Sequence, residues 1–173
     1  MSQPVSETLR RAEQLRREFD QSFARPPRQL LEAAQDFLEI QVGNDIYALR
    51  LDQLSGVIAD QRIVLLPSPV KSFLGVAGVR GSIVPVYSLR ALLGYPALES
   101  MPRWVALLGK DRPVGVAFEL TRGHLRVPSG EIVPASGDPS RRALGHDAIR
   151  RGDSTIPILN TEHLLQEIQR SAR

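Results

Sequence analysis

The sequence predicts a mainly β protein that consists of two similar small barrels with short helices, preceded by a helical arm at the N-terminus. Three observations predict this fold class. Short runs of alternating apolar and polar residues are separated by Gly, Pro and Asp, which is typical of barrels and sandwiches. One pattern of turn, strand and helix start occurs twice along the chain. The N-terminal segment has the periodicity of a helix instead of a strand.

Residues 1–36 form the predicted arm or linker. Within it, residues 5–23 predict an amphipathic helix, because apolar residues recur at spacings of three and four and share one face. Pro26-Pro27 ends this helix. The face can dock on a partner or a second copy, or pack on the protein's own domain, and periodicity does not distinguish these. We expect the rest of the chain to fold without residues 1–36. The apolar residues of the docking face are Leu9, Leu15, Phe19 and Phe23, together with Val5 and Ala12.

Residues 37–173 form the predicted β domain. It begins with a hairpin, because Phe37–Val42 and Ile46–Leu51 alternate on either side of a Gly-Asn-Asp turn. The expected division is a first barrel over about 37–94, a second over about 95–160 and a C-terminal helix over 161–170. Further strands are expected at Ile63–Leu66, Phe73–Val79, Ile83–Tyr87, Trp104–Leu108, Val114–Glu119, His124–Val127, Ala143–Ile149 and Thr155–Leu159.

An internal repeat supports the two-barrel prediction. Arg80-Gly81 opens a strand that contains a proline and leads to Ser88, and Arg151-Gly152 opens a similar strand that leads to Asn160. Ser and Asn are good N-caps, so each strand is expected to run into a helix. The leading hairpins of the two halves also match, because the turn is Gly-Asn-Asp in the first and Gly-Lys-Asp in the second. Two such barrels leave a cleft and free strand edges where another protein can dock.

Composition excludes several classes of function. The chain has no cysteine, which excludes disulfides, thiolate metal sites and a cysteine nucleophile. The net charge of +3 comes from scattered arginines, which is weak evidence for a polyanionic partner. No apolar run approaches the roughly 20 residues of a transmembrane helix, and no secretory signal is present, so we expect a cytoplasmic protein. The three histidines lack metal-ligand spacing, and we expect neither a cofactor nor a catalytic site.

The segment Phe73–Arg90, FLGVAGVRGSIVPVYSLR, resembles the signature of the CheW family of chemotaxis coupling proteins. That signature has a glycine, aliphatic residues, Asn-Leu-Arg-Gly, further aliphatic residues, a proline and Asp-Leu-Arg. The resemblance extends from about Phe37 to Arg170. Here Gly78-Val79 replaces Asn-Leu, Ser88 replaces Asp, and Phe118-Glu119 replaces the family's Val-Asp.

The resemblance implies two SH3-like barrels of about five strands each. It also implies a non-catalytic adaptor in the cytoplasm, at membrane-associated or soluble receptor arrays. A groove between the barrels would take the coiled-coil tip of a chemoreceptor, and opposite ends of the adaptor would meet the regulatory domain of a CheA-type histidine kinase.

Individual residues are carried over from the family in the same way. Arg80 matches the arginine linked to receptor coupling, although it could instead be a turn residue that bonds local carbonyls. Val79, Leu54 and Val57 match apolar residues beside the groove, and Gly81 provides backbone geometry.

A second function class stays open on the residues alone. A basic small-barrel protein that binds nucleic acid would fit the isoelectric point of about 9.8 and the Gly-x-x-Gly-x-x-Gly spacing of Gly75, Gly78 and Gly81. Phosphate contacts weaken steeply with salt, so salt-dependent binding of RNA or DNA would distinguish this class from an adaptor.

Overall fold

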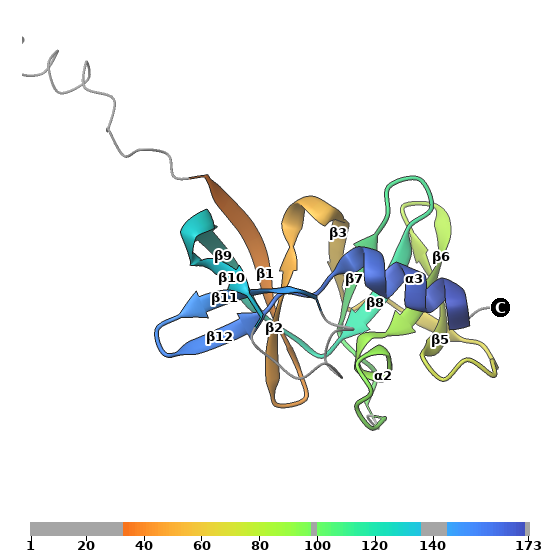
Figure 1. Ribbon diagram of the computed structural model, residues 1–173. Coiled ribbons are helices and arrows are strands. Elements are labelled where there is room, and N and C mark those ends of the chain that lie inside the picture. Colours follow the sequence, from red (N-terminus) through yellow and green to blue (C-terminus); the bar gives the residue numbers. More distant parts are fainter. Residues whose placement is uncertain (1–32, 98–99, 136–144, 172–173) are drawn as a thin grey trace, which may run out of the picture. The chain divides into compact units, whose positions relative to one another are not determined.

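The computed structural model describes residues 33–97, 100–135 and 145–171 of the chain (Figure 1). The predicted helix over 5–23, with its docking residues Leu9, Leu15, Phe19 and Phe23, lies outside the described residues and stays a prediction. The unit that begins at Ala33 is mainly β, as the sequence predicts.

Short strands joined by tight turns make up most of this unit. The strands of the first half are β1 (Ala34–Val42), β2 (Asp45–Arg50), β3 (Leu54–Ala59), β4 (Ile63–Leu65), β5 (Phe73–Val79) and β6 (Ser82–Ser88). Those of the second half are β7 (Trp104–Leu108), β8 (Val114–Phe118), β9 (Leu120–Pro128), β10 (Ile132–Pro134), β11 (Asp147–Arg151) and β12 (Ser154–Pro157). The helical segments are η1 (Leu51–Gln53), α2 (Leu89–Leu92), η2 (Ser129–Glu131) and α3 (Thr161–Ser171).

Most predicted elements are present, with differences at their ends. β5 and β7 have the predicted bounds, and α3 is one residue longer than predicted. β1 begins at Ala34, so the end of the predicted arm belongs to the sheet. β11 begins at Asp147, whereas the predicted strand began at Ala143. Residues 143–144 of that prediction lie outside the described residues. The sequence did not predict β3 or β10: β3 shows no clear alternation of burial, and β10 has only three residues.

Strands from both halves of the chain are mixed in the sheets, so the pairing does not follow the expected division into 37–94 and 95–160. One sheet has the order β3-β7-β8-β6-β5-β4, and two smaller sheets have the orders β2-β1-β9 and β10-β11-β12. The hairpin β7–β8 is therefore inserted between β3 and β6, while the hairpin β1–β2 joins the second half through β9. Alternation tells which face of a strand is buried but not which strand lies beside it, so the sequence could not predict this pairing.

The predicted repeat is present at the level of elements. A two-residue turn joins β5 to β6, and Ser88 Oγ caps α2 by accepting the N–H of Ala91 at 3.2 Å. A second two-residue turn joins β11 to β12, and Asn160 Oδ1 caps α3 by accepting the N–H of His163 at 3.1 Å. The long-range pairing is reciprocal, since β3 pairs with β7 and β9 pairs with β1, both antiparallel. The leading hairpin of each half therefore pairs with strands of the other half.

Three apolar clusters hold the strands together, and Figure 1 shows the two strand groups side by side with α3 running over the larger sheet. One cluster lies inside the six-stranded group and one inside the group of β1, β2 and β9–β12. The largest, the central cluster, takes residues from both groups and from α2 and α3, including Ile40, Leu49, Leu108, Phe118 and Leu164. Among the described residues each group has six strands, where about five were expected.

Candidate protein-interaction surface

The turn between β5 and β6 presents Arg80. Val79 pairs with Ser82, which leaves a loop of Arg80 and Gly81 only. Both residues have positive φ, 50° and 81°, as a type I′ turn requires. Gly81 thus provides backbone geometry, as expected, whereas a left-handed conformation costs a non-glycine residue about 1–2 kcal/mol. An arginine in this position marks the turn as a candidate functional site.

The Arg80 side chain extends from this turn to β3. A Cβ atom added at Gly56 would lie 3.7 Å from Nη2 of Arg80. β3 and β5 are far apart in the sheet order, so this approach shows that the sheet curls around its own cluster, which Val79 and Ile58 share. Arg80 is exposed, and no carboxylate of a described residue lies within ion-pair distance of it. Its guanidinium is available for planar, multi-donor hydrogen bonding.

The structure does not bring all five predicted site residues together. Val79, Arg80 and Gly81 lie at the same turn, and Val79 packs into the cluster inside the six-stranded group. Leu54 and Val57, on β3, pack instead against the central cluster and are only partly buried. The central cluster fills the space between the two strand groups, so Leu54 and Val57 lie at its margin, where a docking groove was expected to be.

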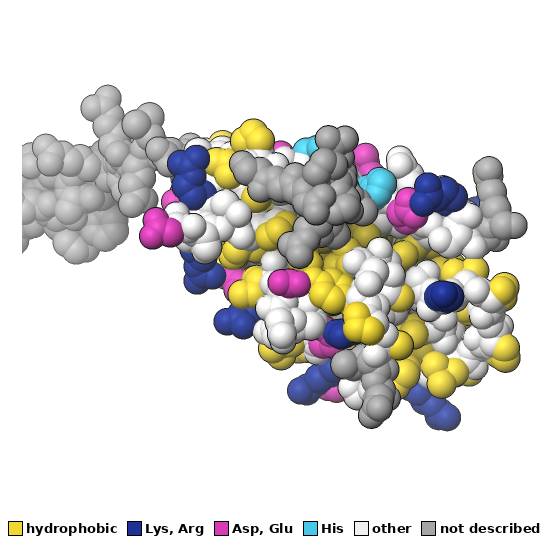
Figure 2. Space-filling view, turned by 60° about the horizontal axis from the view of Figure 1, so that its bottom comes forward, with side chains coloured by type: hydrophobic (Ala, Val, Ile, Leu, Met, Phe, Trp, Pro, Cys, Tyr) yellow, Lys and Arg dark blue, Asp and Glu magenta, His cyan; other side chains and the backbone are white. Residues whose placement is uncertain are grey.

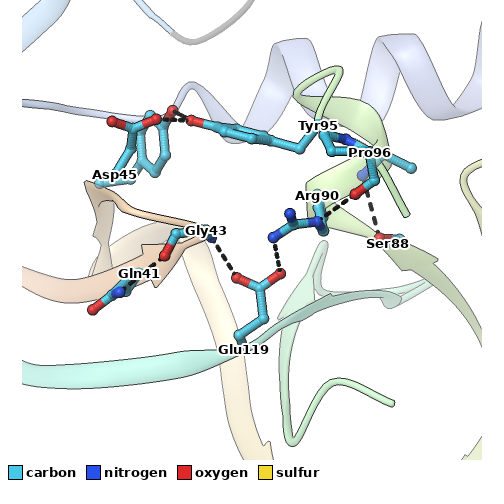
Figure 3. Close-up of polar contacts among 10 residues, drawn as sticks. Gln41, Gly43, Asp45, Ser88, Arg90, Tyr95, Pro96 and Glu119 are labelled. Atoms are coloured by element: carbon cyan, nitrogen blue, oxygen red, sulfur yellow. Dashed lines mark hydrogen bonds and ion pairs between the residues drawn. The ribbon is translucent and has the colours of Figure 1, made fainter. Parts of the chain in front are cut away.

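A polar network ties the two strand groups together beside the central cluster (Figure 3). Glu119 directly follows β8, and its carboxylate accepts the backbone N–H of Gly43 at 2.7 Å and the Arg90 Nη1 at 3.0 Å. Arg90 also donates to the carbonyl of Pro96, and its guanidinium lies over the ring of Tyr95. The network therefore connects the tip of the β1–β2 hairpin with α2 and with the end of β8.

Tyr95 extends this network towards β2. Its hydroxyl contacts the Tyr47 hydroxyl at 2.6 Å and donates to the Asp45 carboxylate. Burial raises the pKa of Tyr95 well above its usual range, and the hydrogen bonds to Asp45 and Tyr47 raise it further. The phenol consequently stays protonated and acts as a donor. The sequence indicated Glu119 only as a departure from the family signature and Gly43 and Asp45 only as parts of a hairpin turn, and it did not indicate that they meet in one network.

Several large apolar side chains of β4 and β6 are exposed, and the sequence did not indicate them. Ile83 of β6 is 79% exposed, and Val64 and Leu65 of β4 are 52% and 63% exposed. Val84 and Val86 of β6 are buried, and strand neighbours alternate between faces, so Ile83 lies on the opposite face. An exposed apolar patch of this kind marks an interaction site more often than a structural one.

Among the described residues, no group of three His, Cys, Asp or Glu side chains is placed to hold a metal ion. His124 contacts Asp36 at 2.9 Å on the surface, and His163 faces Glu167 along α3. None of the helices described is both long and apolar enough to cross a bilayer.

Comparison with known proteins gives a consistent result. Residues 36–169 match the family model described as CheW-like domain. A crystal structure of the scaffolding protein TtCheW from Thermoanaerobacter tengcongensis is similar, with a TM-score of 0.64 at 17% sequence identity. The match covers 73% of this chain and 88% of that one, and at this identity it shows a shared fold. No curated protein matches the chain.

Proposed function

This chain belongs to the family of CheW-like domains, and on that premise we propose that it is a non-catalytic scaffold that couples chemoreceptor-like proteins to a CheA-type histidine kinase. Membership of the family supports a scaffolding role in chemotaxis signalling. The observation that carries the finer proposal is Arg80 itself: it is exposed on a left-handed turn, within the segment that resembles the family signature, and no described carboxylate pairs with it.

Arg80 is proposed to contact the coiled-coil tip of a receptor. Its guanidinium lies over Gly56 on β3, while Leu54 and Val57 of the same strand pack at the margin of the central cluster and are partly exposed. An amphipathic helix that reached both places would bury its apolar face on Leu54 and Val57 while the guanidinium binds polar groups. The kinase regulatory domain is proposed to meet other ends of the scaffold, in the cytoplasm at receptor arrays. The arm residues Leu9, Leu15, Phe19 and Phe23 are proposed to bind a further partner or a second copy.

Sedimentation velocity with purified proteins tests this function. The full chain is mixed with the regulatory domain of the CheA-type kinase from the same cell, and separately with a receptor cytoplasmic-tip fragment. We expect a complex with each. If neither forms at micromolar concentrations, the coupling role is wrong.

One substitution tests the role of Arg80. Asn tolerates the left-handed conformation, so Arg80→Asn removes the guanidinium and keeps the turn. We expect the variant to bind the receptor fragment at least tenfold more weakly and the kinase domain as before. Arg112→Ala, another exposed arginine, is the matched control and is expected to change neither affinity.

A further inference from the structure

The outer face of β4, β5 and β6 is apolar, and within the described part of the chain its residues Val64 and Ile83 are exposed. The strand register aligns Val64 with Val76 and Val76 with Pro85, and it aligns Gly78 with Ile83. The residues between them, such as Ala77 and Val84, are buried in the cluster inside the sheet. Alternation therefore places the aligned residues together on the opposite face. The residues of this outer face are Val64, Val76, Gly78, Ile83 and Pro85.

This outer face is open and held in a fixed shape. A Cβ atom added at Gly78 would meet nothing within 4 Å, so the centre of the face is flat. At Gly75 the backbone of β4 approaches so closely that an added Cβ would lie 2.0 Å from the carbonyl oxygen of Val64. β4 is therefore in close backbone contact with β5. It is the edge strand of the six-stranded sheet, and no other described strand pairs with its free edge. Figure 2 shows hydrophobic side chains gathered towards the right-hand end of the molecule, where β5 and β6 lie in Figure 1.

The stretch that carries this outer face has only positive charges, and the exposed Asp60 just before it is paired with Arg103. Residues 61–90 contain no Asp or Glu. Three of the basic residues in this stretch, Arg62, Lys71 and Arg80, are exposed, and no described carboxylate lies within ion-pair distance of them. Arg62 immediately precedes β4, and Arg80 lies at the turn at the same end of β5. An apolar face with a cationic border is complementary to an apolar segment with acidic neighbours.

We propose that the outer face of β4–β6 docks a partner protein through an apolar segment flanked by acidic side chains. A second copy of the chain is disfavoured as the occupant, because it would bring the same cations to the same border. Nucleic acid is disfavoured because its phosphates would meet Val64 and Ile83 and no aromatic side chain for stacking. The inference goes beyond the coupling role, since it names the chemistry of the bound surface and holds for whichever protein supplies it.

A pair of synthetic peptides tests the proposal. The probe is Asp-Asp-Val-Ile-Val-Leu-Asp-Asp, and its control has the same apolar centre with Lys at all four charged positions. Each is titrated into the isotope-labelled full chain and followed by amide chemical shifts. We expect the acidic peptide to shift amides of β4–β6 and to bind at least tenfold more tightly than the basic one. Equal binding of the two peptides, or shifts confined to other strands, would overturn the proposal.

Substitutions on the surface complete the test. Ile83→Asp is expected to weaken the acidic peptide at least tenfold, whereas Leu120→Asp, at another exposed apolar position, is expected to have no effect. If Ile83→Asp unfolds, Ile83→Thr replaces it in the titration, because threonine keeps the β-branched shape and is also expected to weaken binding of the acidic peptide. A concentration-dependent dimer that Ile83→Asp abolishes would instead identify a second copy as the occupant and refute the proposal. These outcomes do not depend on the kinase or receptor fragments, so a failure here leaves the coupling role untouched.

Discussion

The carboxylate of Glu119 accepts the backbone N–H of Gly43 at 2.7 Å, although 76 residues separate them in the chain. Gly43 lies at the tip of the β1–β2 hairpin, with a φ of 62°. Glu119 follows β8, which belongs to the other strand group. Only proline lacks the backbone N–H, and its ring cannot adopt the positive φ of Gly43, so the carboxylate is the part of this contact that can be tested.

Removing the charge of Glu119 should destabilise the fold. The ion pair with Arg90 is partly buried, with side-chain exposures of 21% for Glu119 and 15% for Arg90. Hydrogen bonds to charged groups contribute about 1.5–3 kcal/mol, so we expect Glu119→Gln to lower the free energy of unfolding by about 1–2 kcal/mol. Urea denaturation measures this. Glu131→Gln, at an exposed position in η2, is the control, and an equal effect of both substitutions would contradict the role of Glu119.

The raised pKa of Tyr95 predicts a pH dependence. The folded protein keeps the phenolic proton above pH 10, where an unfolded tyrosine loses it. The stability that this hydroxyl contributes is therefore complete below pH 10 and decreases as the pH rises above it. We expect the difference in urea midpoint between the wild type and Tyr95→Phe to shrink from pH 8 to pH 10.5. A difference that stays constant over this range would show that the hydroxyl is not held in its protonated form.

The cluster at Glu39 predicts an asymmetric response to substitution. Glu39 is 5% exposed, and its carboxylate pairs with Arg122 and Arg151 at 3.1 Å each. The arginines are 45% and 60% exposed, so they can turn to water when the carboxylate is removed. The buried carboxylate cannot turn to water in the same way when the arginines are removed.

We therefore expect the double variant Arg122→Gln/Arg151→Gln to lose about 2–3 kcal/mol of stability and Glu39→Gln only about 1 kcal/mol. The double variant Arg126→Gln/Arg150→Gln alters exposed arginines of the same two strands and is the control. Chemical denaturation of all three gives the comparison. The asymmetry is refuted if Glu39→Gln is the most harmful.

Two glycines of β5 are expected to differ sharply in their tolerance of a methyl group. Gly75 has a φ of 147°, and an added Cβ would lie 2.0 Å from a backbone oxygen. Gly78 has open space around it and no positive φ. We expect Gly75→Ala to cost about 3 kcal/mol or more, while Gly78→Ala changes stability by less than about 1 kcal/mol. Thermal unfolding of the two variants measures this difference. Similar unfolding midpoints would contradict the expectation.

Residues 1–36 were expected to be dispensable for folding, but the last three of them belong to β1. Ala34, Gln35 and Asp36 pair with β9, and Gln35 and Asp36 also contact Arg50 and His124. We expect deletion of residues 1–32 to leave the unfolding temperature unchanged. Deletion of residues 1–36 removes three strand pairs and should lower stability by about 1–3 kcal/mol. Identical unfolding temperatures for the two truncations would show that this end of β1 contributes nothing.

Local sequence patterns predicted the elements better than their arrangement. The short apolar runs Phe73–Val79 and Trp104–Leu108 placed β5 and β7 to the residue, and the caps at Ser88 and Asn160 located both helices. The exchange of hairpins was missed, because alternation is the same whichever strand lies next to β1.

The candidate site was predicted only in part, for a related reason. Arg80 and Gly81 were found through their resemblance to a known signature. The outer face of β4–β6 was missed, because Ile83 and Val64 look like core residues until the burial of their strand neighbours is considered. The contact between Glu119 and Gly43 depends on the fold of the whole unit, and no local pattern indicates it.

The insertion of β7 and β8 between β3 and β6 has a consequence for synthesis. While the ribosome is still making the second half, β3 and β6 of the nascent first half have neighbours in this sheet that do not yet exist. Unpaired edges of this kind attract other strands, so the emerging chain is exposed to misassociation until residue 118 has left the exit tunnel. Translation speed across the second half, or a chaperone that shields these edges, should therefore influence the yield of folded protein.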